Sequence, residues 1–287
     1  MLFSKSSITA LLMALMTTFS FVLSAQAEES KPLGVTVTVV PLQAMVEAIG
    51  GEHVAVTVMV PPGTHPRTFE PTPKQMMALE SSAIYISMGI PHENNWLPQV
   101  KSSRPDMPIL NMIDNVTTRT KEGGQKQDPH IWLGPTQLSA MADSLRDTLI
   151  KLSPKHEAEF TENTKAWQAE LSAVVEDAKV RLAPYKGKSI LVFHPAFGYL
   201  TDTFGLTQLA IEQKGMQPGP MMMAASIKAA KDANIKTIFV QAQFSKDEAR
   251  TIASEIGGDV VQLNPLAPDL IKNFKDIVLA FEASFQQ

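Results

Sequence analysis

Residues 153–184 read SPKHEAEFTENTKAWQAELSAVVEDAKVRLAP, and this segment sets the organisation of the whole chain. It has no glycine, and its only prolines are Pro154 and Pro184, near its two ends. Its apolar side chains recur at gaps made of threes and fours, which predicts one buried stripe along a helix: Phe160, Trp167, Leu171, Val174, Ala178 and Leu182. Proline just after Ser153 is typical of a helix start. A helix inside a single domain and a rigid helix between two lobes both fit the pattern.

The sequence on both sides of this segment favours the connecting helix. Before it, short apolar runs predict strands at 35–40, 54–60, 83–87 and 108–112, with helices over 42–49 and 74–79. After it, similar runs predict strands at 189–193, 208–211, 237–241 and 260–263, with helices over 222–232 and 246–256. Such alternation implies parallel sheets with helices on both faces. We therefore predict an α/β protein with two Rossmann-like lobes, 28–152 and 185–287, joined by one long rigid helix, 153–184.

The first 27 residues predict export. Lys5 precedes an apolar run over 8–23, and Ala25-Gln26-Ala27 is a small-x-small cleavage pattern. Threonine and serine dilute the run, which favours a signal peptide over a membrane anchor. No cysteine follows the cleavage point, so we expect an unlipidated monomer in the periplasm that begins at Glu28.

Composition limits the partners and the ligands. The formal net charge is −4 and no basic patch stands out, so nucleic acid is not expected as a partner. The chain has no cysteine, so any metal site must use histidine, carboxylate or amide ligands.

Histidines at predicted strand ends are the candidate site residues. Ligands of open α/β sheets bind at the carboxyl ends of strands. Four of the six histidines stand in loops that we assign to such ends: His65, His92, His130 and His194. The other two lie in polar surroundings and are predicted to be surface residues: His53 and His156.

Two of these histidines have informative neighbours. His194 directly follows the strand 189–193, where an imidazole can bind a metal, catalyse, or form a hydrogen bond in the core. His130 lies in Asp128-Pro129-His130, where Asp128 can accept a hydrogen bond from the second ring nitrogen. Short-spaced zinc motifs are missing, so spacing alone does not establish a metal site.

Several motifs in order along the chain resemble those of the zinc- and manganese-specific solute-binding proteins of ABC importers, the cluster A-I family. They are residues 62–71 (PGTHPRTFEP), 89–93 (GIPHE), 128–133 (DPHIWL), 193–199 (FHPAFGY), 217–220 (QPGP), 238–244 (IFVQAQF) and 264–266 (NPL). The resemblance implies two lobes joined by a long helix and a protein that is not an enzyme. It also implies capture of a divalent ion, Zn2+ first and Mn2+ or another divalent metal second, for delivery to an ABC permease in the inner membrane.

The resemblance carries over only part of the family's metal site, which uses three histidines and one acidic residue. His130 and His194 fall on two of the histidine positions, whereas Arg67 and Asn264 stand at the other two. Arginine cannot be deprotonated in proteins, so Arg67 cannot bind a metal and would repel a dication. We expect His65 as third ligand.

The remaining candidates of this site are weaker. His92 and Asn264 are further candidate ligands, and we expect Arg67, Glu93 and Gln241 to line the cleft. Histidine nitrogens with a neutral oxygen suit zinc or copper better than manganese.

Two other functions stay open from the sequence. Arg67 with His130 and His194 could bind an anion or a metal–anion complex, because arginine suits bidentate contacts with oxyanions. A metallohydrolase would need an open metal position and a general base, for which Glu93 is the one obvious candidate.

Overall fold

The computed structural model describes residues 31–64, 68–120, 127–212, 218–244 and 246–287. The predicted signal peptide, His65 and Arg67 lie outside the described residues. Leu33–Gln287 forms one compact unit. Within the described residues, no helix is both long enough and apolar enough to cross a membrane.

The first sheet has four parallel strands in the order β2-β1-β3-β4. Their bounds are β1 Leu33–Val39, β2 Val54–Val60, β3 Ile84–Ser87 and β4 Ile109–Asn111. The residues of β1 from Val35 to Val39 are all buried, so both faces of this sheet are covered, as is typical of parallel sheets.

The second sheet repeats the same topology in the order β6-β5-β7-β8, again with all strands parallel. Its strands are β5 Ser189–Val192, β6 Thr207–Ala210, β7 Thr237–Gln241 and β8 Asp259–Leu263. All eight predicted strands are present, with ends that differ by at most two residues. The predicted fold class is therefore confirmed.

Nine helices surround the sheets in the described part of the chain. They are α2 Val40–Gly50, α3 Pro73–Glu80, α4 Leu97–Ser103, α5 Pro135–Leu152, α6 Glu157–Leu182, α7 Gly198–Phe204, α8 Pro220–Asp232, α9 Lys246–Ile256 and α10 Leu270–Ser284. The sequence patterns did not assign α4, α5, α7 or α10.

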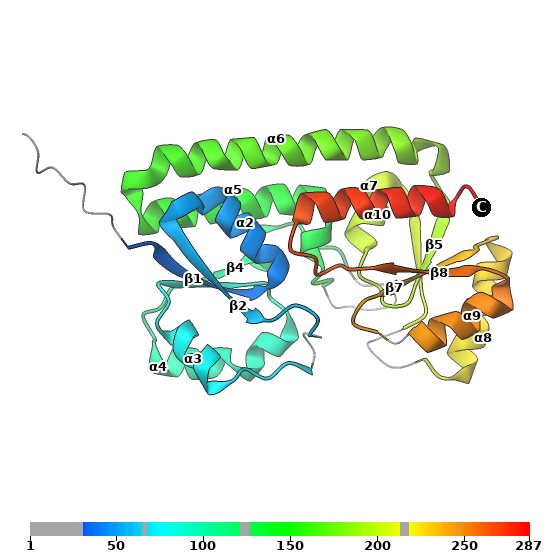
Figure 1. Ribbon diagram of the computed structural model, residues 1–287, viewed down its shortest axis with the longest axis horizontal. Coiled ribbons are helices and arrows are strands. Elements are labelled where there is room, and N and C mark those ends of the chain that lie inside the picture. The colour runs from blue at the N-terminus through cyan, green and yellow to red at the C-terminus, as the bar shows by residue number, and fades with distance from the viewer. Residues whose placement is uncertain (1–30, 65–67, 121–126, 213–217, 245) are drawn as a thin grey trace, which may run out of the picture. The chain divides into compact units, whose positions relative to one another are not determined.

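Helix α6 is the predicted connecting helix. Its 26 residues make it about 39 Å long, and a short 3-10 turn, Pro154–His156, precedes it. It packs against α2 and α5 at one end and α10 at the other (Figure 1). The predicted stripe is buried apart from Val174, which is half-buried, and Thr164 is buried with it.

The apolar core is continuous between the two halves. One cluster of buried side chains includes Val37 of β1, Trp167 of α6, Val192 of β5 and Phe281 of α10. A second cluster lies between the second sheet and helices α8 and α9, around Ile238. The helix stripe therefore contributes to a core that both sheets share.

Candidate metal-binding pocket

Loops that follow strands of both sheets line one pocket. In each sheet the chain leaves the first strand, β1 or β5, and adds later strands on both of its sides. The loops that follow such strands are where open α/β sheets bind ligands. Val39, His92, His194 and Gln241 follow or end β1, β3, β5 and β7, and all four line the pocket. The fold thus brings loops far apart in the sequence to one place.

His194 is held firmly at the end of β5. Its Nδ1 lies 2.7 Å from a carboxylate oxygen of the buried Glu212. Its backbone is bonded on both sides to the amide of Gln241, which accepts from the His194 N–H at 3.2 Å and donates to the His194 carbonyl at 2.6 Å. Gln241 lines the pocket and positions His194.

His130 is held by Asp128, as the sequence suggested. One carboxylate oxygen of Asp128 lies 2.6 Å from His130 Nδ1 and accepts from the His130 backbone N–H at 3.1 Å. The other accepts from Arg119 at 3.1 Å. Burial opposes ionisation of Asp128, but the bonds from His130 and Arg119 outweigh it and hold the pKa of Asp128 below its usual range. His130 does not follow a strand; it stands just before the 3-10 turn Ile131–Leu133 that leads into α5.

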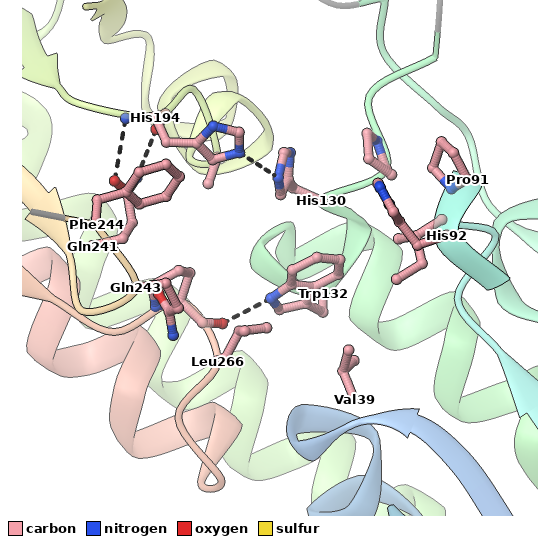
Figure 2. A pocket seen from close by; sticks show the side chains of 14 residues that line it. Val39, Pro91, His92, His130, Trp132, His194, Gln241, Gln243, Phe244 and Leu266 are labelled. Atoms are coloured by element: carbon pink, nitrogen blue, oxygen red, sulfur yellow. Dashed lines mark hydrogen bonds between the residues drawn. The ribbon is translucent and has the colours of Figure 1, made fainter. Parts of the chain in front are cut away.

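The two imidazoles meet through their second nitrogens. His130 Nε2 and His194 Nε2 lie 3.2 Å apart, and Figure 2 shows the rings pointing toward each other. Because each Nδ1 faces a carboxylate oxygen, each Nδ1 carries the ring proton and each Nε2 of a neutral ring carries a lone pair. Two lone pairs at this distance repel each other unless a cation lies between them. The arrangement therefore calls for a proton or a metal ion at this point.

The surroundings of the two rings are mostly apolar. The Phe244 ring stacks on His194 with centroids 5.3 Å apart, and Trp132 contacts His130 at 5.4 Å. Trp132 donates from Nε1 to the Pro265 carbonyl at 2.8 Å, which holds the indole in place (Figure 2). Apolar walls lower the local dielectric and strengthen the interaction of the imidazoles with a bound cation.

Of the two further candidate ligands, His92 lies on the pocket wall and Asn264 does not. His92 lines the pocket and is half-buried (Figure 2). Asn264 is exposed and is not among the lining residues; its side-chain oxygen accepts from the Leu266 N–H at 3.1 Å and from Gln243 at 3.3 Å.

The expectation that Glu93 lines the cleft is wrong. Its carboxylate is buried and accepts hydrogen bonds from the Thr38 and Ser87 hydroxyls and from the backbone N–H groups of Met88 and Gly89. Burial is the main reason that the pKa of Glu93 is raised above its ordinary value. The carboxylate satisfies donors at the end of β3, so it cannot serve as a base in the pocket.

Sequence reasoning missed three of the residues that support the histidines, namely Glu212, Arg119 and Tyr199. Glu212 follows β6 as His194 follows β5, so its place after a strand was the signal that could have found it. Arg119 joins the halves by pairing with Asp128 and with Asp202 of α7. Tyr199 of α7 donates to the Asp128 carbonyl at 2.7 Å.

The fold and the pocket define an α/β binding protein whose two parallel sheets share one ligand pocket beside a long connecting helix. The model of the ZnuA family, described as the periplasmic component A of a zinc-uptake complex, matches residues 35–280, and the chain belongs to this family. The resemblance drawn from the motifs is thereby confirmed. The family consists of binding proteins and not of enzymes.

Individual relatives agree with the family match. A crystal structure of ZnuA is 32% identical, has a TM-score of 0.84, and is matched over 88% of this chain and 99% of its own. A ZnuA deletion mutant solved with zinc bound has the same identity and TM-score and is matched over 98% of its length. The high-affinity zinc uptake system protein ZnuA of Bacillus subtilis is 25% identical over 85% of this chain and 81% of its own length.

The streptococcal relatives are longer proteins. The zinc-binding protein AdcA of Streptococcus pyogenes is 26% identical over 89% of this chain. The match covers 55% of AdcA, so the chain spans about half the length of this relative.

Proposed function

We propose that this protein captures a divalent metal ion, zinc first, between His130 and His194 and delivers it to an ABC permease of the inner membrane. The contact of 3.2 Å between the two Nε2 atoms carries the proposal. Two nitrogens bound to one tetrahedral zinc ion at about 2.0–2.1 Å lie about 3.3 Å apart. The pair therefore has the spacing of two zinc ligands without further movement.

The charges around the pair favour a cation. Asp128 and Glu212 each place a buried carboxylate oxygen within 2.7 Å of an imidazole, opposite the side on which the ion would bind. Carboxylates in this position orient ligating histidines and raise their basicity. They also disfavour the alternative in which the pocket binds an anion. The hydrolase alternative loses its general base because Glu93 lies outside the pocket lining.

The donor set supports zinc over manganese. Imidazole nitrogens suit zinc, whereas manganese is bound better by oxygen ligands. A third ligand has to come from the loop that contains His65, or from His92 on the pocket wall. Arg67 stays a predicted cleft residue that would weaken dication binding. Zn2+ is the cargo of this site, and Mn2+ is the second choice.

We further propose that the chain works in the periplasm as an unlipidated monomer after removal of residues 1–27. The proposed lobes are 28–152 and 185–287, with 153–184 as the connection between them. This arrangement rests on the export signal of the sequence and on the match to a periplasmic family.

The experiment is a zinc titration of untagged protein in competition with a chromophoric chelator, together with analysis of the metal that copurifies. We expect tight binding that His130→Ala and His194→Ala each abolish. Zinc should also stabilise the wild type by about 2.7 kcal/mol when free zinc is 100 times Kd. Asn94→Ala removes an exposed side chain next to the pocket loop and is the matched control.

Two results would overturn the assignment. If both histidine variants bind zinc as the wild type does, the metal is not held between these rings. If the folded wild type binds neither zinc nor manganese in the pocket but binds an oxyanion, the cation proposal fails and the anion alternative takes its place.

A further inference from the structure

A second set of ligand-type side chains lies on other elements of the fold. His53, His156 and Glu159 can each offer one ligand atom, and these atoms all lie within 4.8 Å of one another. None of the three lines the pocket. The two histidines were expected to be surface residues; they are half-buried, and their rings are in contact.

Three short segments of backbone bring this cluster together. His53 ends the 3-10 turn Gly51–His53 between α2 and β2. His156 ends the 3-10 turn before α6, and Glu159 lies in the first turn of α6. The Asn163 side chain donates to the Ile49 carbonyl at 3.1 Å and ties the end of α2 to α6. The cluster therefore rests on packed elements and not on a long loop.

The side chains already contact one another. His53 Nε2 lies 2.8 Å from a carboxylate oxygen of Glu159, and the rings of His53 and His156 stack with centroids 3.5 Å apart. Phe160 backs both rings, with centroids 5.9 Å from each. Gly51 allows this closeness, because a Cβ there would lie only 3.2 Å from a Glu159 oxygen.

We propose that His53, His156 and Glu159 form a second divalent-metal site of the zinc class, separate from the pocket. Two imidazoles and one carboxylate are a donor set that binds zinc with one position left open to water. The local surroundings suit a dication, since Glu52 stands beside His53 and the Glu159 side chain is 48% exposed. Lys155 is the opposing charge next to His156.

The geometry sets the strength of this site relative to the pocket. The two rings are nearly parallel, with 16° between their planes, so their nitrogen lone pairs do not yet converge. Binding has to rotate the rings and bring ligand atoms that now span up to 4.8 Å to about 3.3 Å. The His130–His194 pair needs no such movement, so the second site binds zinc more weakly than the pocket. A bound ion would join the turn between α2 and β2 to the start of α6.

The test uses untagged full-length protein with Zn2+ alone as the probe. We expect the wild type to bind about two zinc equivalents, the weaker of which is lost in His53→Ala/His156→Ala. Glu159→Gln keeps the shape but removes the charge and should weaken the second site by about tenfold or more, as loss of a supporting carboxylate alone does. Histidine ring NMR signals should identify His53 and His156 as the groups that zinc shifts in the weaker step.

The pocket variant His130→Ala/His194→Ala separates this proposal from the proposed function. This pocket variant should still bind the weaker zinc equivalent, whereas His53→Ala/His156→Ala should still bind the tighter one. Lys155→Ala removes a neighbouring cation that is no ligand, so it should leave the second site intact or tighten it. Equal zinc stoichiometry and affinities in the wild type and in folded His53→Ala/His156→Ala would overturn the second site, whatever the pocket does.

Discussion

Carboxylates that contact the two pocket histidines set the position of their ring protons. Each Nδ1 faces a buried carboxylate, Asp128 for His130 and Glu212 for His194. This places the ring proton on Nδ1 and makes Nε2 the ligand atom of the proposed metal site. The sequence placed a ligand-type residue at each position, but the carboxylate behind His194 comes from the segment after β6.

Glu212→Gln tests this support at the scale of one residue. Glutamine can still accept the hydrogen bond from His194 Nδ1 but removes the negative charge. We expect zinc affinity of the pocket to fall about 10- to 100-fold with the fold intact. The chelator competition titration measures it, with Gln243→Ala, a pocket side chain that contacts neither histidine in a described hydrogen bond, as control. An unchanged affinity would mean that Glu212 has only a packing role.

Glu93 predicts a pH dependence of stability. Burial raises the pKa of Glu93 in the folded state, so its contribution to stability is fully present below the ordinary glutamate pKa of about 4.3 and is lost as the pH rises through the raised value. Glu93→Gln loses an acceptor for the Gly89 N–H and should lower the free energy of unfolding by about 1–3 kcal/mol at low pH.

The difference between wild type and Glu93→Gln should then shrink as the pH rises above about 4.3. Urea unfolding of both proteins at several pH values measures it. A difference that grows with pH would show that the carboxylate is held in its ionised form by its donors, and the stated sign would be wrong.

At the scale of elements, helix α7 ties the second half of the chain to the loop that holds His130. The Tyr199 hydroxyl donates to the Asp128 carbonyl at 2.7 Å and accepts from the Arg119 N–H at 3.1 Å. A Cβ on Gly198 beside it would lie 1.8 Å from the Arg119 guanidinium, so a side chain there would displace Arg119. The helix therefore supports the pocket without contributing a ligand.

Tyr199→Phe removes this connection. The change leaves a backbone carbonyl and a backbone N–H without their partner, so we expect the free energy of unfolding to fall by about 1–3 kcal/mol. Tyr185→Phe is the matched control, because the Tyr185 hydroxyl accepts one exposed hydrogen bond, from Gln286 at 3.4 Å. This substitution should lower the free energy of unfolding by less than about 0.5 kcal/mol. Equal effects in urea unfolding would contradict the role given to α7.

At the scale of the molecule, one apolar core joins the two sheets. Buried side chains of β1, α6, β5 and α10 belong to the same cluster. Because the stripe of α6 contacts helices of both halves, the halves cannot unfold separately without exposing it. We therefore expect one cooperative unfolding transition.

Phe281→Ala tests this expectation. Phe281 of α10 is fully buried and packs on Phe239 with ring centroids 5.0 Å apart, so the truncation should cost about 3–5 kcal/mol. The tryptophans, Trp96, Trp132 and Trp167, lie in or before α6, so their fluorescence reports on the other half. The unfolding transitions recorded by fluorescence and by far-UV circular dichroism should move to lower denaturant concentration together. Leu279→Ala, on the exposed side of α10, should shift neither transition. Separate transitions would show two independent lobes.

The sequence by itself determined the strands and the long helix, and the resemblance of its motifs to a known family singled out His130 and His194. The strands and the helix depend on local patterns: apolar runs of strand length and a stripe at helical spacing. His194 could be assigned because β5 fixes its direction, and Asp128 because it lies two residues before His130.

Only the tertiary structure decided which side chains meet. Glu212 reaches His194 because β6 lies beside β5, and His53 reaches Glu159 because α2 packs on α6. Glu93 lies in a loop after a strand, where the sequence pattern places cleft residues. Its carboxylate instead points to the end of β3, because it accepts hydrogen bonds from Ser87 and Gly89 there. Such contacts join residues dozens of positions apart and depend on sheet order and helix packing, which no local pattern encodes.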